Sequence, residues 1–315
     1  MIGCGRPRLL ILTAFAIGLL FLTVYRYPVF LPSNTDLFEW QPFGRGRGSA
    51  TQPIWLIATS TPAQSLQRRS IIRSTWQALF RNETLFETRF VLANPPAEWS
   101  SVIAKENETH GDIIILKHLE ESSRIANTVK SIEFLKYITA WPGKWSFVSK
   151  IDDDSFLDPN AFYKEYLMPL INSVPQLSEQ LVGIGRKLDM NGFEYPGGQF
   201  YTLSWAMVEK LASLHAENPI TDEHEDVLIG RLLHEADVPW HFTKLPNRVA
   251  FDYDDSLGAN LGGKKTAWAK EDADLDAWVH AVGSRAINPH KMRGDEEYLR
   301  VAACYDSNGL KRHGH

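Results

Sequence analysis

The chain has 315 residues, of which 44% are hydrophobic and 23% are charged, and its formal net charge is −5. These values are ordinary for a globular protein with one large domain or two small ones. The negative charge gives no support for nucleic-acid binding, so we expect no nucleic-acid partner.

An uncharged apolar run from Leu9 to Val24 is the first predicted element, and two arginines precede it. A helix over this run would span roughly 25 Å at about 1.5 Å per residue, which suits a thin bilayer. A cleaved signal peptide is the alternative, but no small-x-small cleavage site follows the run. We therefore expect a cytoplasmic tail over residues 1–8 and an uncleaved transmembrane signal anchor over residues 9–25, with the rest of the chain in the lumen.

Residues 26–52 contain several prolines and an Arg-Gly run without periodicity, which predicts a flexible stem. A luminal domain is expected over residues 53–315. Two glycosylation sequons, at Asn82 and Asn107, agree with that location and with a glycoprotein. The two cysteines would lie on opposite sides of the membrane and could not form a disulfide.

Apolar strands and helical segments alternate from residue 53 onward. The predicted strands are 54–59, 88–93, 112–116 and the run that ends at residue 151, and the predicted helices are 67–80 and 127–137. Strands separated by helices indicate an α/β fold with a mostly parallel sheet and helices on both faces. After residue 250 the pattern has few strands, so we expect irregular or partly helical structure there.

Three consecutive carboxylates, Asp152, Asp153 and Asp154, follow the apolar strand that ends at residue 151. Adjacent like charges repel one another unless a cation neutralises them, and ligands of α/β folds bind at the carboxyl ends of strands. Contiguous carboxylates without His or Cys nearby favour Mn²⁺ or Mg²⁺ over a zinc site. Such ions typically hold phosphates as well, so the substrate is expected to carry a diphosphate. A solvated acidic turn is the alternative.

A second acidic cluster contains Asp222, Glu223, Glu225 and Asp226, directly before an apolar stretch that predicts a helix. The helix dipole stabilises acidic residues at a helix N-terminus, which explains one or two of these carboxylates. The other interpretation is a general base at the mouth of the site, since a carboxylate beside others accepts a proton more readily.

Two further motifs have two interpretations each. Gly197 and Gly198 lead into an aromatic β-type run, so they form either a turn or a close backbone approach to a ligand. Arg69 and Arg73 fall on one face of a predicted helix, where they could bind phosphate or form structural ion pairs.

The series of motifs resembles that of the β-1,3-glycosyltransferases of glycosyltransferase family 31, in particular the galactosyltransferase and N-acetylglucosaminyltransferase members. The resemblance covers about residues 54–245, and the combination is more specific than the acidic triplet alone. The motifs that carry it are Arg69-x-x-x-Arg73-x-Thr75-Trp76, residues 90–93, residues 111–114, Lys150 to Phe156, Tyr195 to Ser204 and Glu225-Asp226-Val227. Residues 121–131 match a further family segment only loosely.

The resemblance implies a GT-A fold in a single-pass type II Golgi membrane protein with a luminal catalytic domain. It also implies an inverting, metal-dependent transfer of a hexose, galactose or N-acetylglucosamine, from a UDP-sugar to an acceptor glycan on a glycoprotein or glycolipid in β-1,3 linkage. A catalytically silent Golgi glycan-binding protein on the same scaffold is the alternative function. A metal-dependent phosphohydrolase would need further metal ligands at suitable spacing.

The resemblance also implies roles for single residues. The Mn²⁺ (or Mg²⁺) ligands would be Asp154, Asp152 and His290, with His280 as an alternative to His290. The catalytic residues would be Asp226, the base that removes a proton from the acceptor hydroxyl, and Glu225 beside it. The residues that bind the nucleotide-sugar would be Arg69, Arg73, Lys150, Asp152, Asp153, Gly197 and Gly198.

Overall fold

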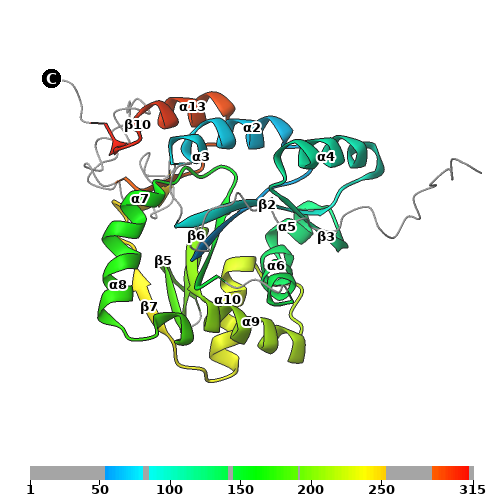
Figure 1. Ribbon diagram of the computed structural model, residues 1–315. Helices are drawn as coiled ribbons and strands as arrows, with labels where there is room; N and C mark the ends of the chain where they lie inside the picture. The colour runs from blue at the N-terminus through cyan, green and yellow to red at the C-terminus, as the bar shows by residue number, and fades with distance from the viewer. Residues whose placement is uncertain (1–53, 81–84, 141–144, 191, 253–285, 312–315) are drawn as a thin grey trace, which may run out of the picture. The chain divides into compact units, whose positions relative to one another are not determined.

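The computed structural model describes residues 54–80, 85–140, 145–190, 192–252 and 286–311 (Figure 1). The chain divides into two units, residues 1–48 and 49–315, and every described residue belongs to the second. The predicted tail, anchor and stem lie outside the described residues, as do Asn82 and His280. In the part of the chain that is described, no helix combines the length and the apolar character that a membrane span requires.

A seven-stranded sheet with the order β3-β2-β1-β4-β6-β5-β7 forms the centre of the second unit. Its strands are β1 (Trp55–Ser60), β2 (Phe86–Asn94), β3 (Ile113–Glu120), β4 (Phe147–Asp152), β5 (Val182–Met190), β6 (Phe193–Ser204) and β7 (His241–Lys244). The strands β1 to β4 are parallel to one another, β6 is antiparallel to β4 and β5, and β7 is parallel to β5. The predicted α/β fold with a mostly parallel sheet is confirmed.

Helices cover both faces of the sheet, because successive residues of a central strand point to opposite faces. Trp55 and Ile57 of β1 belong to one core cluster, and Leu56 and Ala58 belong to the other. The first face is covered by α2 (Leu66–Ser74), α3 (Trp76–Leu79), α4 (Ala97–His110), α7 (Pro159–Phe162), α8 (Met168–Ser173) and α13 (Asp295–Ala303). The second face is covered by α6 (Lys130–Thr139), α9 (Trp205–Glu217) and α10 (Glu225–Glu235).

The remaining elements are short and lie in the connections. They are α5 (Ser123–Asn127), η1 (Tyr163–Leu167), η2 (Leu177–Glu179), β8 (Ala250–Asp252), β9 (Asn288–His290), β10 (Tyr305–Asp306) and β11 (Gly309–Leu310). The helix predicted over 67–80 is divided into α2 and α3 at Thr75, whose hydroxyl donates to the carbonyl oxygen of Ile71. A threonine that bonds to the preceding turn in this way often bends a helix.

The segment after residue 286 pairs with the acidic turn that follows β4. The backbone nitrogens of Phe156 and Asp158 donate to the carbonyl oxygens of Pro289 and Ile287, at 3.0 and 2.9 Å. The nitrogen of Met292 donates to the carbonyl oxygen of Asp154 at 3.1 Å. This pairing brings β9, with His290 at its end, against the carboxylates that follow β4.

Candidate active site

The acidic triplet begins at Asp152, the last residue of β4, which lies where the sheet changes from parallel to antiparallel pairing. Ile151 and Phe156 flank the acidic turn and are both 0% exposed, so the core fixes its position. The side chains of Asp152 and Asp154 remain 33% and 26% exposed. The turn therefore presents accessible carboxylates at the carboxyl end of β4, where α/β folds bind ligands.

Asp152, Asp154 and His290 each offer a ligand atom, and these atoms lie within 4.8 Å of one another. The Nε2 atom of His290 lies 3.0 Å from Asp154 Oδ1 and 3.7 Å from Asp152 Oδ2. Burial alone would lower the pKa of His290, but hydrogen bonds to Asp154 and Asp252 outweigh it and raise the pKa to about 9. Two carboxylates and an imidazole form a donor set that fits Mn²⁺, with the neutral imidazole as the ligand.

Asp252 is a further carboxylate of this cluster that the sequence interpretation missed. Its Oδ1 atom lies 2.6 Å from Nδ1 of His290, and its Oδ2 atom lies 3.3 Å from both Arg186 Nη1 and Lys291 Nζ. The sequence does contain a pattern that could have identified Asp252. The short apolar run 249–251 is followed directly by this carboxylate, just as the apolar strand β4 leads into the acidic triplet.

Asp153 has a different environment from its two neighbours in the triplet. Its Oδ2 atom accepts a hydrogen bond from the Thr61 hydroxyl at 2.8 Å. Burial, assisted by the charges of Asp154 and Asp152, raises the pKa of Asp153 to about 6 against the effect of Thr61. Asp153 is therefore the carboxylate of the triplet that is held by Thr61, the residue directly after β1.

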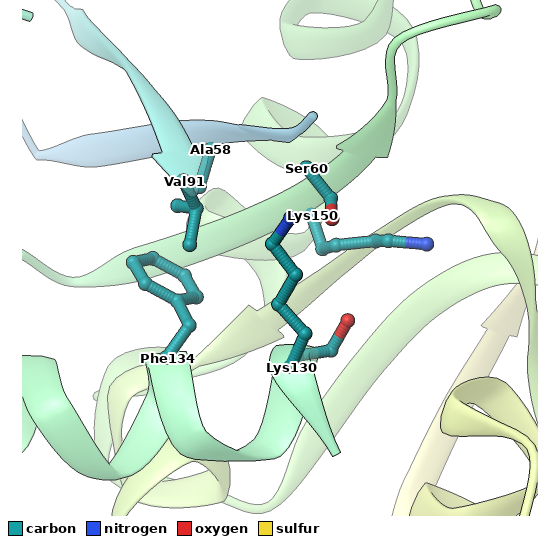
Figure 2. Close-up of a pocket in the computed structure, with 7 residues that line it drawn as sticks. Ala58, Ser60, Val91, Lys130, Phe134 and Lys150 are labelled. Atoms are coloured by element: carbon teal, nitrogen blue, oxygen red, sulfur yellow. The ribbon is translucent and has the colours of Figure 1, made fainter. Parts of the chain in front are cut away.

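Lys130 holds the backbone of Thr61 in place through a buried hydrogen bond. Its Nζ atom donates to the carbonyl oxygen of Thr61 at 2.8 Å and lies 3.5 Å from Glu121 Oε1. Figure 2 shows this side chain extending from α6 toward Ser60, where it lines a small cavity together with Lys150. Both Glu121 and Lys130 belong to the segment 121–131 that matched the family pattern loosely, so that segment contributes to the site through buried contacts.

A pocket opens beside the triplet, and it contains charges of both signs. Its lining consists of Gln64, Ser65, Gln67, Arg68, Asp153, Asp154, Arg293 and Asp295. Arg68 is engaged: it donates to the carbonyl oxygens of Met292 and Arg293 and pairs with Asp295 at 2.9 Å. The Arg293 side chain is exposed and has no ion-pair partner among the described residues, so it is the arginine of this pocket that is available to an anion.

Lys150 is not available to a ligand, which corrects the prediction that it binds the nucleotide-sugar. Its side chain is 5% exposed, and its Nζ atom lies 2.6 Å from the Gly198 carbonyl oxygen, 2.6 Å from Asp152 Oδ1 and 2.5 Å from Glu225 Oε1. An ammonium group has three N–H donors, and these three partners use all of them. Burial would lower the pKa of Lys150, but Asp152 and Glu225 outweigh it and raise the pKa, so the group stays charged.

Glu225 and Asp226 form the first turn of α10, as the helix interpretation of the second acidic cluster expected. Glu225 faces inward, where it pairs with Lys150 and lies 3.4 Å from the Tyr201 hydroxyl. Asp226 accepts hydrogen bonds from the backbone nitrogens of Gly198 and Val227, at 3.2 and 2.8 Å, and pairs with no cation among the described residues. Of the two predicted catalytic carboxylates, Glu225 is engaged in a buried ion pair, whereas Asp226 has no cation partner among the described residues.

Gly197 and Gly198 lie inside β6, so the interpretation of the pair as a turn is wrong. A Cβ atom on Gly198 would lie 2.7 Å from Glu225 Oε1, whereas the nearest neighbour of a Cβ on Gly197 would be Gln199 Oε1 at 3.3 Å. The close approach that Gly198 permits is to the protein's own carboxylates rather than to a ligand.

Arg69 and Arg73 form structural ion pairs, which corrects the prediction that they bind the nucleotide-sugar. Arg69 is 0% exposed and donates to both oxygens of Glu106 in α4 and to backbone carbonyls. Arg73 pairs with Glu106 and, through two hydrogen bonds, with Asp112. The fully buried guanidinium of Arg69 cannot reach a phosphate, and that of Arg73, which is 14% exposed, is engaged by the carboxylates of Glu106 and Asp112.

The chain is similar to known glycosyltransferases in sequence. The Galactosyltransferase family model matches residues 67–184. The β-1,3-galactosyltransferase 4 proteins of Rattus norvegicus and Mus musculus are each 26% identical over 125 residues, which is 38% of this chain. The match spans about a third of their length, 32% of each relative. These findings agree with the resemblance to galactosyltransferases drawn from the motifs.

Solved structures with a similar arrangement were also found. The crystal structure of the galactosyltransferase LgtC with donor and acceptor sugar analogues is 12% identical, with a TM-score of 0.45, over 82% of this chain and 98% of that chain. The apo structure of the bifunctional glycosyltransferase WbbM is 10% identical, with a TM-score of 0.43, over 82% of this chain and 50% of that chain.

Proposed function

We propose that the chain is an inverting, metal-dependent glycosyltransferase of the GT-A fold. It transfers a hexose, galactose or N-acetylglucosamine, from a UDP-sugar to an acceptor glycan in β-1,3 linkage. The observation that carries the proposal is the cluster of Asp152, Asp154 and His290 at the end of β4, beside the pocket that contains Arg293. The family model supports the general reaction, and the linkage rests on the family resemblance.

The donor is held by the acidic cluster and the pocket next to it. Asp152, Asp154 and His290 would hold the cation, which would supply Lewis-acid stabilisation of the charge on the departing UDP. Arg293 is placed to contact the diphosphate, because it is exposed in the pocket that Asp154 also lines. Asp153 lines the same pocket, where it would face the nucleotide.

The acceptor is activated by Asp226. Its carboxylate is oriented by the backbone nitrogens of Gly198 and Val227, and it accepts the proton of the attacking hydroxyl. Glu225 and Lys150 hold the first turn of α10 in place and take no part in proton transfer. Direct attack by the activated hydroxyl inverts the anomeric centre.

The cellular location is part of the same proposal. The protein is a single-pass type II Golgi membrane protein with its catalytic domain in the lumen, and its acceptors are glycoproteins or glycolipids. The apolar run at residues 9–25 and the sequons support this location. Protection of the luminal domain from protease in sealed membranes tests it, and digestion without detergent would contradict it.

A donor screen tests the reaction. Recombinant residues 50–315 with Mn²⁺ are incubated with a panel of UDP-sugars and glycan acceptors, and UDP release is measured. We expect acceptor-dependent release for one hexose donor. Release of free sugar without any acceptor would indicate a phosphohydrolase, and the absence of Mn²⁺-dependent UDP binding would favour the silent glycan-binding protein.

The base is tested separately with Asp226→Asn. This variant should abolish transfer and leave UDP binding nearly intact, because the amide cannot accept the proton and Asp226 belongs to a different element from the metal ligands. Normal turnover by the variant would show that another group is the base.

A further inference from the structure

Asp252 lies directly opposite His290 in the two-stranded parallel pair of β8 and β9. The side chains are 14% and 13% exposed, so both are shielded from most solvent. The 2.6 Å contact joins Asp252 Oδ1 to Nδ1 of His290, on the side of the ring away from the other carboxylates. The Nε2 atom, on the other side of the ring, faces Asp154 and Asp152.

The Oδ2 atom of Asp252 pairs with two basic side chains and not with the histidine. Arg186 of β5 and Lys291 both lie 3.3 Å from Oδ2. Lys291 has a φ of 65°, which is uncommon for a residue other than glycine, so the chain turns sharply directly after His290. The two oxygens of one carboxylate therefore have separate partners: Oδ1 the imidazole and Oδ2 the cations.

The backbone on both sides of His290 is also held. Pro289 accepts a hydrogen bond from Phe156, and Met292 donates one to Asp154. Backbone bonds fix where the ring begins but not how it is rotated or which nitrogen carries the proton. Of the described groups, Asp252 is the one in hydrogen-bond contact with Nδ1.

We propose that Asp252 is a positioning residue for the metal site, which rests on the proposed function of that site. By accepting the Nδ1–H of His290, it keeps Nε2 directed toward Asp154 and Asp152, with which His290 would hold the cation. In metal sites, a carboxylate that accepts the second ring N–H of a ligating histidine, without binding the metal itself, fixes the tautomer of that histidine and raises its basicity as a ligand.

The two oxygens of Asp252 make Asp252→Asn a specific test. An amide has one oxygen and one NH₂ group. The donors Arg186 and Lys291 require the oxygen, so the NH₂ group would face Nδ1 of His290. Nδ1 would then accept a hydrogen bond and Nε2 would carry the proton, which blocks it as a metal ligand.

The experiment measures the Mn²⁺ affinity of the full chain, solubilised in detergent, in the presence of UDP, from the electron paramagnetic resonance signal of free Mn²⁺. We expect Asp252→Asn to bind Mn²⁺ about 10- to 100-fold more weakly than the unsubstituted protein. Asp189→Asn is the matched control, because Asp189 is an exposed aspartate of β5 outside the cluster, and it should bind Mn²⁺ normally. Melting temperatures are recorded for each variant, so that affinities are compared on folded protein.

A double-variant comparison separates positioning from a general structural effect. If Asp252 acts through His290, adding Asp252→Asn to a His290→Gln protein should cause no further loss of Mn²⁺ affinity. An additional loss as large as that of the single variant would overturn the proposal. Arg186→Gln, which leaves Oδ1 on the imidazole, should change the Mn²⁺ affinity little, and a loss equal to that of His290→Gln would also overturn it.

Failure of this inference is distinguishable from failure of the proposed function. Equal Mn²⁺ affinity in Asp252→Asn and the unsubstituted protein would refute the role of Asp252 and leave the metal site standing. Absence of Mn²⁺ binding in the unsubstituted protein with UDP would refute the metal site itself.

Discussion

Lys150 is the residue at which the two acidic motifs meet. One ammonium group lies within 2.6 Å of Asp152, which belongs to the proposed metal site, and of Glu225, which begins the helix that carries Asp226. The proposed metal site and the helix that carries the proposed base are therefore joined by the ion pairs of one largely buried ammonium group. The run of consecutive carboxylates in the sequence does not indicate which of them pairs with the Lys150 ammonium group.

Removing the ammonium group with Lys150→Met should destabilise the fold, because Glu225 would be left buried without a cation. Breaking a buried pair in this way typically costs about 3–5 kcal/mol of unfolding free energy. The double variant Lys150→Met/Glu225→Gln should regain most of that stability, since it carries no uncompensated charge, yet its transfer rate should stay low because α10 is no longer tied to Asp152. Urea unfolding and initial rates measure the two effects. If Lys150→Met were as stable as the unsubstituted protein, the ion pairs of Lys150 would have no stabilising role.

At the scale of elements, the site depends on the contact between β6 and the first turn of α10. Gly198→Ala would place a methyl group 2.7 Å from Glu225 Oε1, which Lys150 prevents from moving away. Such overpacking typically costs about 1–3 kcal/mol, and here it would displace Asp226 as well. We expect slower transfer and a lower melting temperature. Gly197→Ala is the control in the same strand, and equal rates in the two variants would contradict the argument.

Helices α2 and α4 are joined by the buried ion pairs of Glu106, whose effect depends on pH. Burial alone would raise the pKa of Glu106, but hydrogen bonds and charges from Arg69 and Arg73 outweigh it, so the pKa lies below its usual 4.5. The unfolded chain therefore binds a proton near pH 4.5 that the folded chain does not bind. The stabilising contribution is present above that pH and is lost as the pH falls through the folded pKa.

Glu106→Gln should consequently lower the unfolding free energy at neutral pH and make its decrease below pH 4.5 shallower. Urea unfolding at several pH values on both sides of 4.5 measures the slope. Glu108→Gln on the same helix is the control, because the Glu108 side chain is 70% exposed and an exposed pair contributes about 0–1 kcal/mol. Unchanged UDP affinity in Glu106→Gln would agree with a structural role for Arg69 and Arg73, and an equal slope in both variants would contradict the assignment.

For the molecule as a whole, the sequence predicts best what is encoded by consecutive residues. The strands β1 to β4 are found from apolar runs, and Asp152 to Asp154 are found because three carboxylates adjoin. Helix α4 is missed although it begins after Pro96 and ends at Gly111, whose φ of 63° is typical of a helix C-terminus. The partners of Arg69 and the pairing of Asp252 with His290 could not be predicted, because they depend on which elements the topology places side by side.

The proposed metal site joins distant parts of the chain, since Asp152 and Asp154 follow β4 whereas His290 belongs to the segment beyond residue 286. A ligand that binds the folded chain alone stabilises it, by about 2.7 kcal/mol at a concentration of 100 Kd. For a domain of this size, Mn²⁺ with UDP should therefore raise the melting temperature by about 5–10 °C, and EDTA should reverse the rise. His290→Gln should lose most of the metal-dependent part, because the cation would no longer hold the terminal segment against the acidic turn. Asp189→Asn should keep it, and an undiminished shift in His290→Gln would show that the terminal segment takes no part in holding the metal.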